Sequence, residues 1–296
     1  MDNRKFLFVG NRFYVLQEMI KLALPIVKIY AEKDSFLQKE LEKRNICYAL
    51  LPGKKEFFQD LQSMDFDIFI SNGCPYIIPV GSLSSGGRKF INIHPSLLPD
   101  LKGRNPVNGA LLLDRKHGVT CHYMDDGIDT GTVIEQMEIP LTDDVDLDLL
   151  YQISFRAEGR VFLKAYERRF RPGAVQPHGQ EPVYYTRKDA DRHISPEDSA
   201  EMLLRKVRAF GSEKQYAYFW KNNARIEVIS ASEIKNETAL QLFRSGLHNV
   251  VKAVYGNRFV LAEFGGCLIQ FQLGNTSFFE EGGIFIESQA GAGAYG

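Results

Sequence analysis

Short apolar runs alternate with stretches of helical spacing over residues 1–170, and this alternation constrains the fold more than any other feature. The apolar runs predict strands at 5–9, 26–30, 47–51, 67–71 and 89–94. The stretches between them predict helices at 14–24, 35–44 and 54–64. Strands joined through helices pair in parallel, so we expect an α/β fold with a Rossmann-like, mostly parallel sheet covered by helices. In such sheets, ligands bind beyond the carboxyl ends of the strands.

The pattern changes in the second half of the chain. The first part continues with predicted helices at 105–113 and 147–169 and predicted strands at 119–124 and 132–139. A linker without periodicity follows, and then a predicted helix at 196–210. Short β-like segments with glycine-containing turns then predict a small barrel or sandwich, at 216–220, 225–229, 250–255, 259–264 and 267–272. We therefore predict a catalytic core at 1–175, a linker with a helix at 176–210, a smaller C-terminal β-rich (OB-like) domain at 211–289 and an appended low-complexity tail at 290–296.

Composition narrows the class of protein. With 44% hydrophobic and 25% charged residues the chain can bury a sizeable core. Its formal net charge of -1 disfavours a nucleic acid as the main partner. No apolar run approaches the length of a membrane span, and the run near the N-terminus is too short for a signal sequence. We therefore expect a cytoplasmic protein without a membrane partner.

The cysteines and histidines show no metal-ligand spacing, so no metal site is predicted. Dispersed cysteines in apolar contexts are expected to be buried free thiols: Cys47, Cys74, Cys121 and Cys267. Four dispersed histidines are expected at the surface: His117, His178, His193 and His248.

Three residues could together perform acyl transfer. Asn92 and His94 are two residues apart on a predicted strand, so their side chains point to the same face. Asp129 lies in a glycine-flanked loop between two later strands. A carboxamide and an imidazole can stabilise a tetrahedral oxyanion, and the imidazole can move a proton off an attacking amine. The competing structural interpretations are a buried histidine, a turn-capping asparagine and an ordinary loop aspartate.

Two motifs contain these residues. The first is Asn92-Ile93-His94-Pro95-Ser96-Leu97-Leu98-Pro99. The second is Gly118-Val119-Thr120-Cys121-His122-Tyr123-Met124-Asp125-Asp126-Gly127-Ile128-Asp129-Thr130-Gly131. Both resemble signatures of the 10-formyltetrahydrofolate-dependent formyltransferases, and the resemblance covers residues 1–170. The region to 289 is more loosely similar to the C-terminal β domain of methionyl-tRNA formyltransferases and 4-amino-arabinose formyltransferases.

The resemblance implies an N-formyltransferase that uses 10-formyltetrahydrofolate as co-substrate. A substrate amine would attack the formyl carbon, and Asn92 and His94 would donate hydrogen bonds to the oxyanion that forms. His94 would also shuttle the proton of the amine. Asp129 would bias His94 toward its charged form and help to deprotonate the amine, since an opposite charge raises the pKa of an imidazole.

The resemblance also implies a folate site. The matching positions are Asn72, Gly73, Cys74, Tyr76, Ile77, Ile78 and Pro79 in one loop, and Asp125, Asp126, Gly127 and Ile128 in another. A flat pterin needs an apolar slot with backbone donors and acceptors at its edge, and glycine allows close approach. The alternative is a plain strand-to-helix turn.

The departures from the family pattern bear on the amine. Methionyl-tRNA formyltransferases usually carry an Arg-Gly-Ala-Ala-Pro-like run after the Leu-Leu-Pro loop. This chain departs from that pattern, with Lys102-Gly103-Arg104-Asn105-Pro106 at the same place. The segment 183–191 is similar to one in formyltransferases of nucleotide-linked amino sugars, and its aromatic and basic residues suit a nucleobase and a pyrophosphate. It could instead be a linker with a packed tyrosine pair. Candidate substrate-binding residues are Ser96, Lys102, Gly103, Arg104, Asn105, His122, Tyr184, Tyr185, Arg187 and Lys188. His122 could equally pack beside its strand.

The preferred substrate is therefore a nucleotide-linked amino sugar, which would place the enzyme in surface-polysaccharide (lipopolysaccharide) biosynthesis. Four alternatives stay open: formylation of initiator methionyl-tRNA, formylation of another small amine, hydrolysis of formyltetrahydrofolate, and a non-catalytic scaffold. The sequence is also compatible with a homodimer. It does not specify the sugar, the nucleotide or the amino position.

Overall fold

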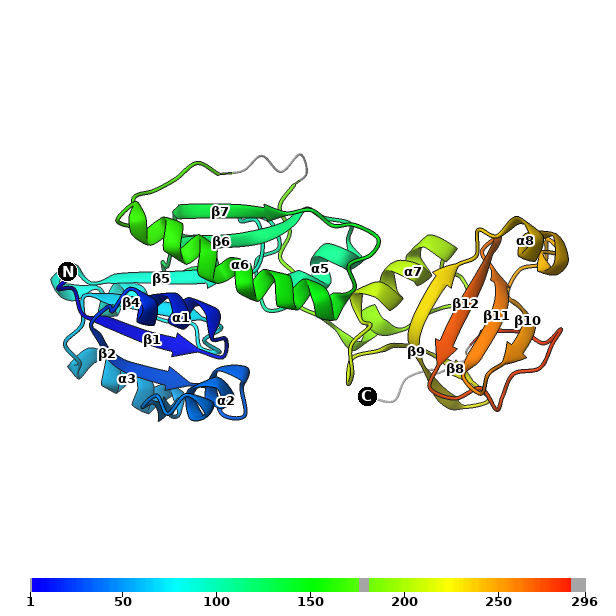
Figure 1. The fold of residues 1–296 in the computed structure, drawn as a ribbon, viewed down its shortest axis with the longest axis horizontal. Helices are drawn as coiled ribbons and strands as arrows, with labels where there is room; N and C mark the ends of the chain where they lie inside the picture. Colours follow the sequence, from blue (N-terminus) through cyan, green and yellow to red (C-terminus); the bar gives the residue numbers. More distant parts are fainter. Residues whose placement is uncertain (1, 176–180, 289–296) are drawn as a thin grey trace. The chain divides into compact units, whose positions relative to one another are not determined.

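The computed structural model describes residues 2–175 and 181–288, which form two compact units. The first unit comprises residues 1–106, 116–142 and 150–185, and the second comprises 107–115, 143–149 and 186–296. Figure 1 labels the elements of both. The start of the predicted linker at 176–180 and the predicted tail at 290–296 lie outside the described residues, and so does His178.

A seven-stranded sheet forms the centre of the first unit (Figure 1), in the order β3-β2-β1-β4-β5-β6-β7. Its strands are β1 (Phe6–Gly10), β2 (Ile26–Ala31), β3 (Ala49–Leu50), β4 (Ile68–Asn72), β5 (Lys89–His94), β6 (His117–Tyr123) and β7 (Val133–Ile139). The first five pair in parallel, whereas β6 runs antiparallel to both β5 and β7. The expectation of a mostly parallel α/β sheet is therefore confirmed.

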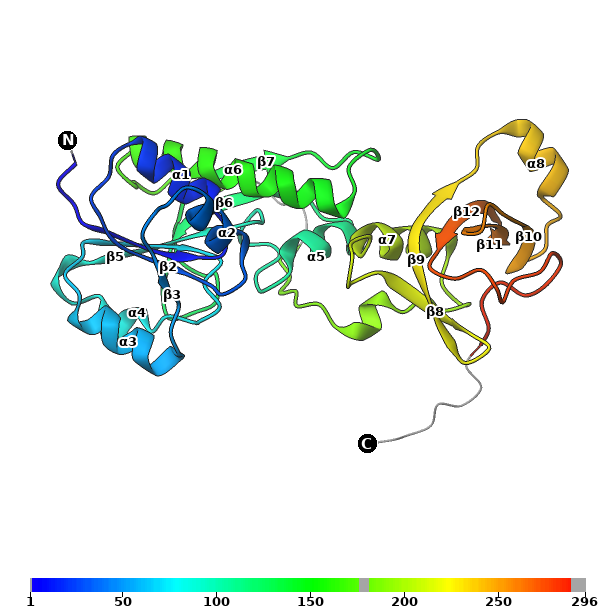
Figure 2. The same cartoon turned by 60° about the horizontal axis from the view of Figure 1, so that its bottom comes forward.

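Helices cover both faces of this sheet, with α1 and α6 on one face and α3 and α4 on the other (Figure 2). The helices of this unit are α1 (Tyr14–Lys21), α2 (Phe36–Lys43), α3 (Lys54–Ser63), α4 (Val80–Leu83) and most of α6 (Leu147–Glu167), with a 3₁₀ turn at Ser85–Gly87. Helix α5 (Pro106–Leu112) belongs to the second unit except for its first residue. On β1, Leu7 and Val9 pack with Phe57 and Leu61 of α3. Successive strand residues point to opposite faces, so the intervening Phe8 serves the other layer. Burial on both faces explains why these strands are continuous apolar runs.

The second unit contains an antiparallel five-stranded sheet in the order β10-β11-β12-β9-β8. Its strands are β8 (Ala217–Lys221), β9 (Ala224–Glu233), β10 (Val250–Tyr255), β11 (Phe259–Phe264) and β12 (Cys267–Leu273). Its core includes Phe285, whose ring centroid lies 4.4 Å from that of Phe271 and 5.1 Å from that of Phe219. The predicted β-rich C-terminal region is confirmed. The unit also holds α7 (Ala200–Ala209), α8 (Glu237–Phe243) and a 3₁₀ turn at Asp189–Arg192.

The structure corrects two helix predictions in this unit. The helix predicted from residue 196 begins at Ala200, because Asp198 closes a separate turn by accepting a hydrogen bond from the Ser195 amide. Ser199 then caps the helix by accepting from the Met202 amide. Helix α8 was not predicted, although Asn236 provides a typical cap by accepting from the Ala239 amide.

Two predictions about burial were also wrong in part. The four cysteines are free, but only Cys121 is buried, whereas Cys47 is exposed and Cys74 and Cys267 are partly exposed. His117 was expected at the surface but is buried, because its position at the start of β6 points inward to the Ser154 hydroxyl, 2.7 Å from Nε2. Among the described residues, no helix is both long and apolar enough to cross a membrane.

Candidate active site

A pocket of about 450 Å³ opens in the first unit where neighbouring strands end. Its lining begins with Glu32 after β2 and continues through Asn11 and Arg12 after β1. It then follows the ends of β4 and β5 to Asp129, in the loop between β6 and β7. The pocket therefore lies at the edge of the sheet where ligands of open α/β folds bind.

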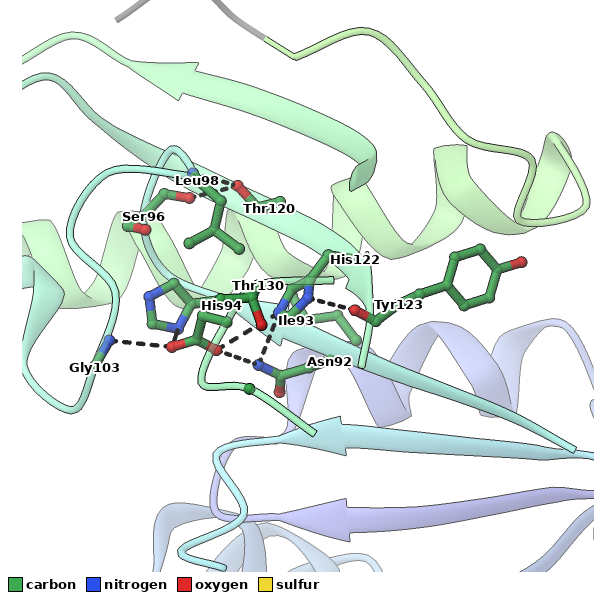
Figure 3. A network of polar contacts seen from close by, with 12 residues as sticks. Asn92, Ile93, His94, Ser96, Leu98, Gly103, Thr120, His122, Tyr123 and Thr130 are labelled. Atoms are coloured by element: carbon green, nitrogen blue, oxygen red, sulfur yellow. Dashed lines mark hydrogen bonds and ion pairs between the residues drawn. The ribbon is translucent and has the colours of Figure 1, made fainter. Parts of the chain in front are cut away.

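The three predicted catalytic side chains meet in this pocket. Asn92 and His94, both labelled in Figure 3, are two residues apart on β5, so their side chains point to the same face. Both reach Asp129. The Asn92 amide nitrogen lies 3.3 Å from Asp129 Oδ1, and His94 Nδ1 lies 3.6 Å from Asp129 Oδ2. Asp129 adopts a left-handed backbone conformation with φ of 53°, which non-glycine residues seldom adopt. The structure thus confirms that the two strand residues share a face and lie beside the loop carboxylate.

A backbone carbonyl determines the protonation of His94. Nε2 lies 3.1 Å from the carbonyl oxygen of Leu101, which can only accept a hydrogen bond. Nε2 therefore carries a proton, and Nδ1 faces Asp129. Burial lowers the pKa of His94 below its usual range, and this effect exceeds the opposing influence of the Asp129 charge. Asp129 thus favours the charged form of His94, as expected, but burial outweighs this effect, so we expect a neutral imidazole at pH 7 with a lone pair on Nδ1.

Asp129 is held as a carboxylate. Burial alone would raise its pKa, but the neighbouring imidazoles of His94 and His122 and the Gly103 amide at 3.1 Å together lower the pKa below its usual range. A carboxylate with a low pKa is a weak base. Asp129 is therefore suited to stabilise a positive charge on His94, and less suited to take a proton from the amine itself.

His122 orients the carboxamide of Asn92 (Figure 3). Its Nδ1 lies 2.7 Å from the carbonyl oxygen of Tyr123, so Nδ1 carries the proton and Nε2 can accept. Nε2 lies 3.2 Å from the Asn92 amide nitrogen. Because Asp129 also accepts from this nitrogen, the N–H side of the carboxamide is directed into the reaction centre.

The predicted folate positions fall into two groups. Eight line the pocket, namely Gly73, Cys74, Tyr76, Ile77, Ile78, Asp125, Gly127 and Ile128. The side chains of Asn72, Pro79 and Asp126 are absent from its lining. Asn72 is fully buried in the sheet, and the Asp126 carboxylate accepts a hydrogen bond from the Gly81 amide at 2.9 Å.

The predicted substrate positions also divide. Gly103, Arg104, His122 and Tyr184 line the pocket, and Lys102 forms a backbone bridge with Tyr184 that places the Tyr184 ring at the rim. Four others are in the same unit without lining the pocket: Ser96, Lys102, Asn105 and Tyr185. The Ser96 hydroxyl donates to the Asp100 carbonyl and therefore supports the loop after β5. Arg187 and Lys188 belong to the second unit.

Sequence reasoning missed one end of the pocket. Asn11, Arg12, Glu32 and Ser71 line it, although no motif marks them. Only their position in the sequence could have marked them as ligand-binding residues, because each ends or closely follows one of the predicted parallel strands. Among the described residues, no group of three or more His, Cys, Asp and Glu side chains could hold a metal ion.

Comparisons with known proteins agree with this geometry. The model of the formyl transferase family matches residues 27–166, and that of the formyl transferase C-terminal domain matches 187–273. A methionyl-tRNA formyltransferase from Acidiphilium cryptum is 35% identical over 153 residues, which are 50% of this chain and 50% of that protein. The chain thus spans about half the length of this relative.

Solved structures with the same fold include sugar-modifying enzymes. WlaRD, a sugar 3N-formyl transferase studied with dTDP and 5-N-formyl-THF, aligns with a TM-score of 0.69 and 20% identity, over 93% of this chain and 100% of its own. An N-formyltransferase from Helicobacter canadensis, in complex with folinic acid and dTDP-3-aminofucose, aligns with a TM-score of 0.69 and 18% identity, over 91% of this chain and 99% of its own. At these identities the likeness concerns the fold. With its two parts matched in order by the two family models, the chain belongs to the formyl transferase family.

Proposed function

We propose that this chain transfers a formyl group from 10-formyltetrahydrofolate to the primary amine of a nucleotide-linked amino sugar. The observation that carries formyl transfer is the convergence of Asn92, a neutral His94 and ionised Asp129 in one pocket. These groups supply an oxyanion donor, a base and a charge that stabilises the protonated base.

The reaction follows from these positions. The amine nitrogen attacks the formyl carbon, and a C–N bond forms. The carbonyl oxygen becomes an oxyanion, which accepts a hydrogen bond from the side-chain amide of Asn92. His94 Nδ1 accepts the proton that the amine nitrogen loses, and Asp129 stabilises the imidazolium. When the bond from the formyl carbon to N10 of the folate breaks, His94 returns this proton to N10. The products are the formamide and tetrahydrofolate.

The apolar part of the pocket suits the folate. Tyr76, Ile77 and Ile78 lie along one loop, and Met124 and Ile128 lie along another. Ile77 and Ile128 line the pocket with exposed apolar side chains, which a bound pterin would cover. The pocket volume falls within the range typical of small-molecule sites.

The choice of amine rests on charge and on the pocket rim. The net charge of -1 gives no general attraction for RNA. At the rim, Arg104 and the exposed ring of Tyr184 provide a cation and a stacking surface, which suit a phosphate and a base. Proteins of this fold in complex with dTDP-linked ligands support the same choice. We assign the product to surface-polysaccharide biosynthesis.

Formylation of initiator methionyl-tRNA is the second candidate, because the sequence relatives include methionyl-tRNA formyltransferases. The test is an assay with 10-formyltetrahydrofolate, a panel of 3- and 4-amino dTDP-, UDP- and GDP-sugars, and charged initiator tRNA. We expect transfer to at least one sugar nucleotide. Transfer to tRNA alone would overturn the choice of amine, and formate release without any acceptor would indicate a hydrolase.

A further inference from the structure

One end of the pocket takes no part in the chemistry above. Asn11, Arg12, Glu32 and Ser71 line it at the ends of β1, β2 and β4. In the sheet order, β4 is next to β5, β1 follows, and β2 comes after it.

Arg12 is fixed in place before any ligand arrives. Its Nε donates to Glu158 at 2.9 Å, its Nη2 donates to the Ile93 carbonyl at 3.3 Å, and its guanidinium lies 5.1 Å from the Phe155 ring centroid. Nη1 has no hydrogen-bond partner among the residues that the structure describes, and it lies 3.1 Å from where a Cβ on Gly73 would be. A fixed donor is therefore directed toward the pocket wall at Gly73.

Glu32 and Ser71 add unused acceptors and a further donor. Glu32 Oε2 accepts from the Asn11 amide at 2.9 Å, whereas Oε1 has no partner within the described part of the chain. The Ser71 hydroxyl lines the pocket on a residue that is 3% exposed, and no described group hydrogen-bonds to it. These donors and acceptors face the pocket and have no partner among the described residues, so they are available to bind a polar ligand there.

The charges argue against a phosphate here. Arg12 is the cation of this end, Glu158 accepts a hydrogen bond from it, and Glu32 accepts one from the neighbouring Asn11. Burial raises the pKa of Glu158 to about 7, but Glu32 alone offsets the charge of Arg12, so this end of the pocket has no net positive charge. Carboxylates only accept hydrogen bonds and would repel a phosphate, whereas an alcohol both donates and accepts. A mixture of fixed acceptors and donors without net positive charge suits hydroxyl groups.

The polar end of the pocket lies where the rest of an amine substrate bound at Asn92 would extend. Ser71 is in register with Asn92 on the neighbouring strand. The backbones of Arg12 and Glu32 lie on more distant strands, but their side chains extend back toward β5. Arg12 Nη2 lies 3.3 Å from the Ile93 carbonyl, and the Glu32 carboxylate accepts a hydrogen bond from Asn11, whose side chain lies against Gly73 at the end of β4. A sugar ring with its amine at Asn92 would direct its hydroxyls along this series.

We propose that Ser71, Arg12 and Glu32 form a hydroxyl-binding subsite for the sugar part of the amine substrate, which the motifs of the sequence do not mark. This proposal rests on the proposed function, and it adds the requirement that the acceptor be polyhydroxylated. It also assigns the two ends of the pocket to different substrates, with the folate beside Ile77 and Ile128.

The test compares steady-state kinetics of Glu32→Ala, Glu32→Gln and Ser71→Ala with the wild-type protein, on the sugar nucleotide that the panel identifies. Glu32→Ala removes a charged acceptor of hydrogen bonds from the sugar hydroxyls. We therefore expect its KM for the sugar nucleotide to rise by about 10- to 100-fold. Glu32→Gln, which keeps an acceptor, should show a smaller increase. The KM for 10-formyltetrahydrofolate should not change. Lys33→Ala is the matched control, because Lys33 is the exposed neighbour outside the pocket.

A binding measurement makes the result independent of turnover. Calorimetry without folate, on the corresponding sugar nucleotide with a hydroxyl in place of the amine, should show the same loss of affinity in Glu32→Ala. Unchanged KM and affinity with an active wild-type protein would overturn the subsite alone. An increased KM for the folate instead would assign this end to the co-substrate and also overturn it. If the wild-type protein formylates no sugar nucleotide, the proposed function fails and the subsite fails with it.

Discussion

At the scale of single residues, the contact between His94 Nε2 and the Leu101 carbonyl decides which nitrogen can accept a proton. Burial lowers the pKa of His94, so its charged form should exist only at a pH below the usual histidine range. We predict that nitrogen-15 NMR of the labelled protein at pH 7 will find His94 neutral, with its proton on Nε2. A proton on Nδ1, or a pKa above 6.5, would contradict the mechanism.

In the proposed mechanism, His122 acts through its contact with Asn92 and is a positioning residue. We predict that His122→Phe, which removes the acceptor for the Asn92 amide, will lower kcat by roughly 10-fold, a factor in line with one lost hydrogen bond. His122→Gln should restore most of kcat, because its side-chain oxygen can accept. The KM values should stay near those of the wild-type protein. An increased KM with unchanged kcat would instead show that His122 contacts the substrate.

At the scale of elements, the loop after β5 depends on Gly103. Its φ is +108°, and a Cβ there would lie 2.5 Å from the Tyr185 carbonyl oxygen and 3.0 Å from the Tyr184 ring. We predict that Gly103→Ala will lower activity, because the amide that donates to Asp129 must move. Gly86→Ala is the control, since Gly86 also has positive φ but has open space around it. Gly86→Ala should lose about 1–2 kcal/mol of stability and keep its activity, whereas Gly103→Ala should lose more stability, because of the clash, and also lose activity.

Helix α6 carries a buried carboxyl that makes stability depend on pH. Burial raises the pKa of Glu158 to about 7 from its usual 4.5, and Arg12 opposes this only in part. The folded protein therefore binds this proton more tightly than the unfolded chain. The stability contribution is complete below pH 4.5 and is lost as pH rises to 7.

We predict that Glu158→Gln will reduce the loss of unfolding free energy between pH 4.5 and 7.5 by up to about 3 kcal/mol. Urea denaturation at several pH values measures this difference. Glu167→Gln is the matched control, because Glu167 is exposed on the same helix. Equal pH dependence in wild type and Glu158→Gln would contradict the raised pKa.

At the scale of the whole molecule, most of the fold and the reaction centre could be predicted from the sequence. Strands buried on both faces leave continuous apolar runs, and the motif residues Asn92, His94 and Asp129 lie where strands end. The polar end of the pocket could not be predicted in the same way. Arg12 is positioned by Glu158, which is 146 residues away in the sequence, and no local pattern shows such a contact. The inward direction of His117 depends on its partner Ser154 in the same manner.

The most direct test of the account is transfer of a labelled formyl group from 10-formyltetrahydrofolate to the acceptor amine in a single turnover. We predict transfer by the wild-type protein. The loss of one oxyanion donor in Asn92→Ala should slow transfer by about 10²–10³-fold. His94→Ala should remain folded and lose nearly all transfer, because it removes the base that accepts the proton of the amine in the proposed mechanism. Transfer by His94→Ala at close to the wild-type rate would contradict the mechanism.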